Sequence, residues 1–181
     1  MISEYTSEDG EKLLKLARES IEEGFSGKRP ADLEEKQFKQ ARGVFVTLKK
    51  QGKLRGCIGF PHPVHSVRQA VYEAAKEAAF GDLRFHGLTQ EELKDVKIEV
   101  SILTNPEQVK DVKDIKIGKH GLIGNYIAYS GLLLPQVATE HGMSRIEFLE
   151  ALCDKMGMPK DTWQNKNFRI SRFECQIFGE D

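Results

Sequence analysis

Residues 44–60 read Val44-Phe45-Val46-Thr47-Leu48-Lys49-Lys50-Gln51-Gly52-Lys53-Leu54-Arg55-Gly56-Cys57-Ile58-Gly59-Phe60. Apolar side chains alternate along the first part, and a second strand-like run follows a connection that contains glycine. This pattern is typical of a β-hairpin, whose two strands are antiparallel. The hairpin is the first indication of an antiparallel sheet in this chain.

Elements on both sides of the hairpin agree with this prediction. Residues 96–102 alternate between apolar and polar side chains, which indicates a half-buried antiparallel strand. Helices are predicted at residues 8–23 and 64–80 and directly after Thr89, since apolar residues recur at helical intervals or a capping box is present. Residues 32–42 are rich in charge and indicate a short helix or a solvated crossing.

The second half of the chain mixes strands and helices in the same way. Strands are expected at residues 112–117 and 122–130, with a turn at Gly124-Asn125, and helices at Pro135 and after Ser144. A final strand over residues 170–178 is expected to bury Phe173, Cys175 and Ile177. Because no βαβ alternation occurs, the order favours an α+β fold, with a mainly antiparallel sheet packed with helices.

Length and composition set the class of protein. The 181 residues fit one domain over residues 1–181, with room for two lobes divided near residues 110–120. With 27 basic and 28 acidic residues the net charge is -1, so nucleic acid is not an expected partner. The longest charge-free run, residues 121–139, is interrupted by polar residues and is no membrane span. The start of the chain lacks the pattern of a signal peptide, and three distant cysteines indicate no disulfide framework, so a cytoplasmic location is expected.

The most unusual segment for chemistry is Leu54–Gly59. Two glycines in four residues weaken a strand, so we expect a close approach to the backbone or a bulge, on a concave surface. Strand alternation puts Arg55 and Cys57 on one face. One interpretation is an anion-binding or nucleophilic site with donors from the Gly56 and Gly59 N–H groups. The alternative is a buried cysteine, packing glycines and an Arg55 paired with a surface carboxylate.

Two residues of the second half are further candidates. His120 is a natural general base if it faces Cys57, and an exposed loop histidine is the alternative. Gln136 either binds a ligand or caps a loop. His62 and His65 lack the neighbours that a metal site needs, so no metal ion and no cofactor is expected.

Several motifs together resemble the AMMECR family, which is found in archaea, bacteria and eukaryotes. The resemblance covers roughly residues 10–179 and indicates a stand-alone, archaeal-type member. Two departures from the family pattern, at His86-Gly87 and Met143, lie outside its most specific motif, Leu54–Gly59. The motifs are Leu54–Gly59, Gly43–Leu48, Asp82–Phe85, Ile98–Ser101, Gly118–Leu122 and Gly131–Val137.

The resemblance implies a two-lobed α+β fold with the Leu54–Gly59 strand near a groove. It also implies a pathway shared with Memo-like and radical-SAM proteins, and it does not establish an activity.

Two hypotheses for function follow. In the first, a groove at Leu54–Gly59 binds an anionic ligand, which is a small molecule or part of a partner protein. Arg55 then holds the anion, and Cys57 is a structural thiol in apolar surroundings that oppose its ionisation. In the second, the protein is an enzyme in which Cys57 is the nucleophile and His120 the base, acting on a carbonyl or anionic substrate. No membrane partner is expected in either case.

Overall fold

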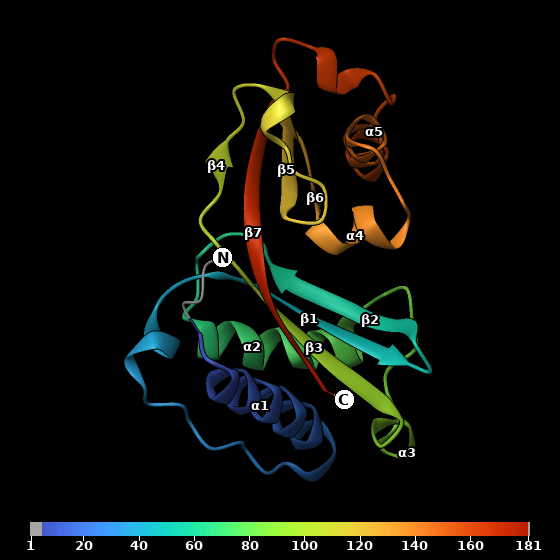
Figure 1. Ribbon diagram of the computed structural model, residues 1–181. Coiled ribbons are helices and arrows are strands. Elements are labelled where there is room, and N and C mark those ends of the chain that lie inside the picture. The colour runs from blue at the N-terminus through green and yellow to red at the C-terminus, as the bar shows by residue number, and fades with distance from the viewer. Residues whose placement is uncertain (1–4, 181) are drawn as a thin grey trace. The chain divides into compact units, whose positions relative to one another are not determined.

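A computed structural model describes residues 5–180 of the chain (Figure 1). The chain forms two compact units. Unit 1 comprises the residues up to Leu103 and those from Gln176 onward, and unit 2 comprises Thr104–Cys175. The boundary after Leu103 precedes the division expected near residues 110–120.

The predicted hairpin is confirmed and forms the centre of unit 1. Strands β1 (Gly43–Lys50) and β2 (Lys53–Phe60) are antiparallel, and β3 (Val96–Leu103) pairs antiparallel with the other side of β1. Gln51 and Gly52 close the hairpin with φ angles of 52° and 75°, the left-handed pair that a two-residue turn requires. β2 is the first strand in the sheet order, so one of its sides has no neighbouring strand.

Two helices cover one face of the strands of unit 1 (Figure 1). The predicted capping boxes begin α1 and α3, because Thr6 and Asp9, and Thr89 and Glu92, satisfy each other's backbone N–H groups. The core between helices and strands is mainly aliphatic, with Val46 and Leu48 fully buried, and it also contains the buried ring of Phe38. The helical elements are α1 (Ser7–Ser26), a 3-10 turn (Lys36–Lys39), α2 (Val67–Lys76), a π-helical turn (Glu77–Gly81) and α3 (Gln90–Leu93).

Unit 2 is a small antiparallel sheet with two helices. In it β5 pairs with both β6 and β7, and β4 pairs with β7. Pro135 occupies the first turn of α4, and a capping box of Ser144 and Glu147 begins α5, as predicted. The elements are β4 (Glu107–Gln108), a 3-10 turn (Val112–Asp114), β5 (His120–Tyr126), β6 (Tyr129–Leu133), α4 (Pro135–Glu140), α5 (Arg145–Lys155), a 3-10 turn (Thr162–Gln164) and β7 (Arg169–Gly179), whose residues from Gln176 onward belong to unit 1.

Three local predictions for the second half are wrong. Residues 112–117 are no strand, since the Asp111 carboxylate accepts the Lys113 N–H and favours a turn. The turn between β5 and β6 lies at Ile127-Ala128 and not at Gly124-Asn125. Gly124 is inside β5, where it packs against side chains of α5 and of the residues that follow α5. In β7 Phe173 is buried, whereas Cys175 is half-buried and Ile177 is exposed.

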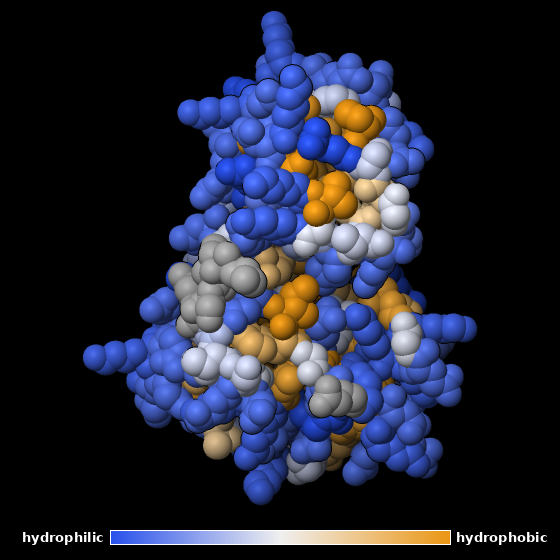
Figure 2. Space-filling view, in the orientation of Figure 1, coloured by the Kyte–Doolittle hydropathy of each residue, from blue (hydrophilic) through white to orange (hydrophobic). Residues whose placement is uncertain are grey.

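The surface seen in Figure 2 is mostly hydrophilic, and hydrophobic side chains appear in small separate groups. Within residues 5–180 no helix is both long enough and apolar enough to cross a membrane.

Candidate functional site

The glycines of the Leu54–Gly59 segment are used for close packing. A Cβ atom at Gly56 would overlap the carbonyl oxygen of Ala78, which belongs to the π-helical turn. A Cβ atom at Gly59 would overlap the carbonyl oxygen of Val44 on β1. The close approach that the sequence indicates is therefore made by the protein's own backbone.

The free side of β2 is covered at Cys57 by a turn that follows α2. The Cys57 N–H donates to Asp82 Oδ2 at 2.9 Å, and Arg84 Nη2 donates to the Cys57 carbonyl at 3.1 Å. Asp82 also accepts from Arg84 through Nε at 2.9 Å and Nη2 at 2.7 Å. We call this arrangement the Asp82–Arg84 clamp, and it supplies the donor and the acceptor that a neighbouring strand would offer.

The electrostatics of the clamp favour a charged Asp82. Its side chain is 4% exposed, so burial alone would favour the neutral acid. The hydrogen bonds from Arg84 act against burial and, with those from the Cys57 and Arg84 N–H groups, hold the pKa of Asp82 well below its usual value. The clamp is thus built on a buried carboxylate whose charge is matched by donors.

Cys57 is a half-buried thiol. Its Sγ lies 3.3 Å from Thr47 Oγ1 on β1. Burial raises the pKa of the Cys57 thiol, and the opposing effects of Thr47 and Arg84 are smaller. The neutral thiol is therefore favoured at neutral pH.

Alkylation of Cys57 is accordingly expected to be slow, with an apparent pKa above about 8.5, the value of a free cysteine. Iodoacetamide labelling at a series of pH values, followed by mass spectrometry of the Cys57 peptide, measures the alkylation rate and its apparent pKa. Cys175 serves as an internal comparison because it is also half-buried. Rapid labelling of Cys57 with an apparent pKa well below about 8.5 would contradict this expectation.

Arg55 pairs with a carboxylate from the short helix α3. Its side chain is 14% exposed, with Nη2 3.0 Å from Glu92 Oε2 and Nε 3.3 Å from Glu92 Oε1. Lys50 Nζ lies 3.0 Å from the same carboxylate. The hydrogen bond from Arg55, followed by that from Lys50, lowers the pKa of Glu92 to about 2. Glu92 therefore pairs with Arg55 and also forms the capping box with Thr89.

A pocket of about 480 Å³ opens beside Arg55, and we call it the Arg55 pocket. The Phe85 ring lies close to two guanidinium groups, with its centroid 5.9 Å from Arg55 Cζ and 5.6 Å from Arg84 Cζ. Arg55 Nη1 is buried and has no hydrogen-bond acceptor among residues 5–180. The pocket is lined by Arg55, Leu83, Arg84, Phe85, His86, Gly87, Thr89 and Glu92.

His120 and Gln136 lie in unit 2, whereas Arg55 and Cys57 lie in unit 1. His120 begins β5 and is buried, so the alternative of an exposed loop histidine is wrong. Its Nδ1 accepts the Lys116 N–H at 3.1 Å, and burial lowers the pKa of the imidazole. Gln136 is half-buried near the start of α4.

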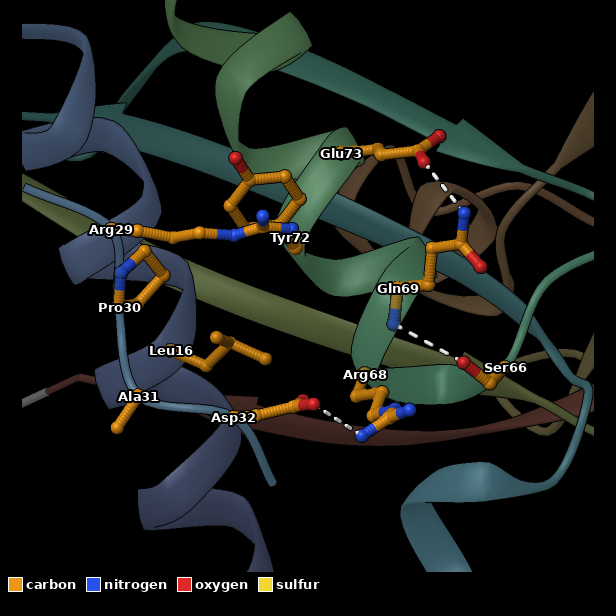
Figure 3. Close-up of a pocket in the computed structure, with 10 residues that line it drawn as sticks. All are labelled: Leu16, Arg29, Pro30, Ala31, Asp32, Ser66, Arg68, Gln69, Tyr72 and Glu73. Atoms are coloured by element: carbon orange, nitrogen blue, oxygen red, sulfur yellow. Dashed lines mark hydrogen bonds and ion pairs between the residues drawn. The ribbon is translucent and has the colours of Figure 1, made fainter. Parts of the chain in front are cut away.

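Unit 1 contains a second pocket, of about 470 Å³, between residues 29–32 and α2 (Figure 3). Its Arg68 is paired with Asp32 at 2.6 Å, and Arg29 lies over the ring of Tyr72. Both arginines of this pocket therefore have a partner, and neither has a buried donor atom without an acceptor among residues 5–180. Across residues 5–180 no group of three or more His, Cys, Asp or Glu side chains is placed to hold a metal ion.

The sequence assigns no binding role to four residues of the Arg55 pocket and the clamp: Asp82, Arg84, Phe85 and Glu92. The sequence contains two local indications of their importance. These are the capping-box spacing of Thr89 and Glu92, and the Asp82–Phe85 motif, which is one of the segments that resemble the AMMECR family. Neither signal indicates a contact with β2.

These features define an α+β protein of two units, with a polar pocket beside an edge strand. Residues 14–178 match the model of the AMMECR1 family, and the chain belongs to that family. A protein of Methanothermobacter thermautotrophicus is 47% identical, over 96% of this chain and 95% of its own length. Protein MK0488 of Methanopyrus kandleri is 45% identical, over 97% and 90%. The crystal structure of uncharacterized protein PH0010 from Pyrococcus horikoshii superposes with a TM-score of 0.90 at 38% identity, over 95% of this chain and 91% of that chain.

Proposed function

We propose that unit 1 is a binding module whose Arg55 pocket takes an anionic group, from a small molecule or from a partner protein. The observation that carries this proposal is the buried Arg55 Nη1, a donor with no acceptor within residues 5–180. A buried polar group without a partner is rare in folded proteins and calls for an explanation. A carboxylate or phosphate is the natural partner of a guanidinium.

Arg84 adds to this argument. Its Nε and Nη2 are used by Asp82 and Cys57, whereas none of these bonds uses Nη1. The clamp fixes the guanidinium beside the Phe85 ring, and the side chain is still 51% exposed. Arg84 therefore adds a second guanidinium group, held in place by the clamp, to the lining of the Arg55 pocket.

The catalytic alternative has less support. A cysteine nucleophile needs a thiolate, and burial raises the pKa of Cys57. A general base needs an accessible nitrogen, and His120 is buried, with Nδ1 already accepting a hydrogen bond. Binding without catalysis by Cys57 is the simpler use of this site.

Titration of the ¹⁵N-labelled chain with acetate and with inorganic phosphate, followed by NMR, tests the proposal. We expect shifts concentrated in Arg55 and residues 83–87. The Arg55→Gln variant should bind at least about tenfold more weakly, since a hydrogen bond to a charged group contributes about 1.5–3 kcal/mol.

Arg68→Gln is the matched control, because Arg68 is also an arginine of unit 1 paired with a carboxylate. It should bind as the unmodified chain does. The proposal is wrong if neither anion shifts the pocket resonances, or if Arg55→Gln and Arg68→Gln weaken binding equally.

A further inference from the structure

Leu83 is an apolar side chain that the fold holds in solvent. It is 100% exposed, at the centre of the Asp82–Arg84 clamp and on the rim of the Arg55 pocket. The backbone on both sides is fixed, since Asp82 and Arg84 bind Cys57 and the Phe85 N–H donates to the Asp82 carbonyl at 3.0 Å. A single exposed leucine is ordinary on a protein surface. Here, however, the leucine is exposed beside two guanidinium groups, those of Arg55 and Arg84.

The Arg55 pocket therefore combines two kinds of surface. Arg55 and Arg84 supply guanidinium donors, whereas Leu83 and the half-buried Phe85 supply apolar area. Gly87 leaves room beside them, because nothing lies within 4 Å of the position that a Cβ atom would take. A ligand that fills such a pocket would have an anionic end and an apolar body.

The charges favour a singly charged anion. Arg55, Arg84 and Lys50 are balanced by only two carboxylates, Asp82 and Glu92, which leaves a surplus of one positive charge. A carboxylate would neutralise this surplus, while a phosphate dianion would exceed it. Glu92, near Arg55, would also repel a dianion more strongly.

We infer that the ligand of the Arg55 pocket is an amphiphilic carboxylate, a carboxylate joined to an aliphatic group. The carboxylate binds Arg55 and Arg84, and the aliphatic group lies along Leu83 and Phe85. This inference rests on the proposed function and narrows it to one ligand class. The same chemistry occurs in a free aliphatic acid and at the C-terminus of a peptide that ends in an apolar residue.

A series of straight-chain carboxylates tests the inference on the full chain. Acetate, butyrate and hexanoate are titrated separately, and the dissociation constant is taken from NMR shifts of residues 83–87. Since burial of one methylene contributes about 0.8 kcal/mol, affinity should rise by up to about fourfold for each added methylene. Inorganic phosphate should bind more weakly than butyrate and hexanoate.

Two variants distinguish the role of Leu83. Leu83→Ser should lose most of the gain in affinity from acetate to hexanoate. Val64→Ser is the control, because Val64 is another exposed apolar residue of unit 1 that does not line the pocket. Val64→Ser should keep the full rise in affinity from acetate to hexanoate.

The outcomes separate this inference from the proposed function. If acetate binds and hexanoate binds no tighter, or if Leu83→Ser keeps the gain, the amphiphilic class is wrong and anion binding stands. Tighter binding of phosphate than of hexanoate also overturns the class. If no anion shifts the pocket residues, the proposed function fails as well.

Where the carboxylates do bind, a comparison of N-acetylleucine with 4-methylpentanoate identifies the source of the ligand. Tighter binding of N-acetylleucine favours a peptide C-terminus, and tighter or equal binding of 4-methylpentanoate favours a free aliphatic acid.

Discussion

The Asp82→Ala variant is expected to unfold about 3 kcal/mol more easily than the unmodified chain, because hydrogen bonds to a charged group contribute about 1.5–3 kcal/mol each. Asp82 accepts the Cys57 N–H, the Arg84 N–H and two guanidinium donors of Arg84. Alanine would leave the Cys57 N–H without its acceptor. Urea unfolding at pH 7, followed by circular dichroism, measures the change.

Arg84→Ala is the matched control for Asp82→Ala. Arg84 is half-exposed, so water can replace part of its contacts, and Asp82 keeps the backbone N–H donors of Cys57 and residue 84. We therefore expect a smaller loss than from Asp82→Ala. A loss from Asp82→Ala no larger than that from Arg84→Ala would show that the buried carboxylate is not the centre of the clamp.

The contribution of Asp82 should also depend on pH. The pKa of Asp82 is lower in the folded protein than in the unfolded chain, where it is about 3.9. Its stabilising effect is therefore fully present above the unfolded pKa and is lost as the pH falls toward the folded pKa. The difference in stability between the unmodified chain and Asp82→Ala should be constant from pH 7 to about 5 and shrink below about pH 4.

The Gly56→Ala variant is expected to lose about 3 kcal/mol, the upper range for an overpacked site. The atom that a new Cβ would meet is the carbonyl oxygen of Ala78, which is backbone and cannot rotate away. Either β2 or the π-helical turn must shift, and that shift would move the adjoining clamp as well. Thermal and urea unfolding measure the effect.

Gly87→Ala is the control for this glycine, since Gly87 has open space at its Cβ position and no left-handed φ angle. Its stability should change by no more than about 0.5 kcal/mol. Equal stabilities of Gly56→Ala and Gly87→Ala would mean that the contact between β2 and Ala78 is not tight in solution.

The sequence predicts those parts of the fold that depend on neighbours along the chain. The hairpin and the capping box of Thr89 and Glu92 are such cases, because the interacting residues are close in sequence. The hairpin turn at Ile127-Ala128 is missed for a local reason. Ile127 has a φ of 55°, which a β-branched residue rarely adopts. The sequence pattern therefore favours a turn at Gly124 instead.

The candidate site could be predicted only in part. Arg55 and Cys57 are noticed because glycines are unusual within a strand. Their partners are not, since Glu92 lies 37 residues from Arg55 and Asp82 lies 25 residues from Cys57. No periodicity or spacing links such distant residues. The tertiary fold brings them together through α2 and the turn that follows it.

The Asp82–Arg84 clamp also has a consequence for self-association. An edge strand with unpaired N–H and C=O groups is a template on which other chains add strands and aggregate. At Cys57 both groups are occupied by side chains that cannot extend a ladder, so β2 is closed to such growth at its middle. The protein can therefore hold Leu83 in solvent beside a sheet edge while that edge resists the recruitment of a further strand.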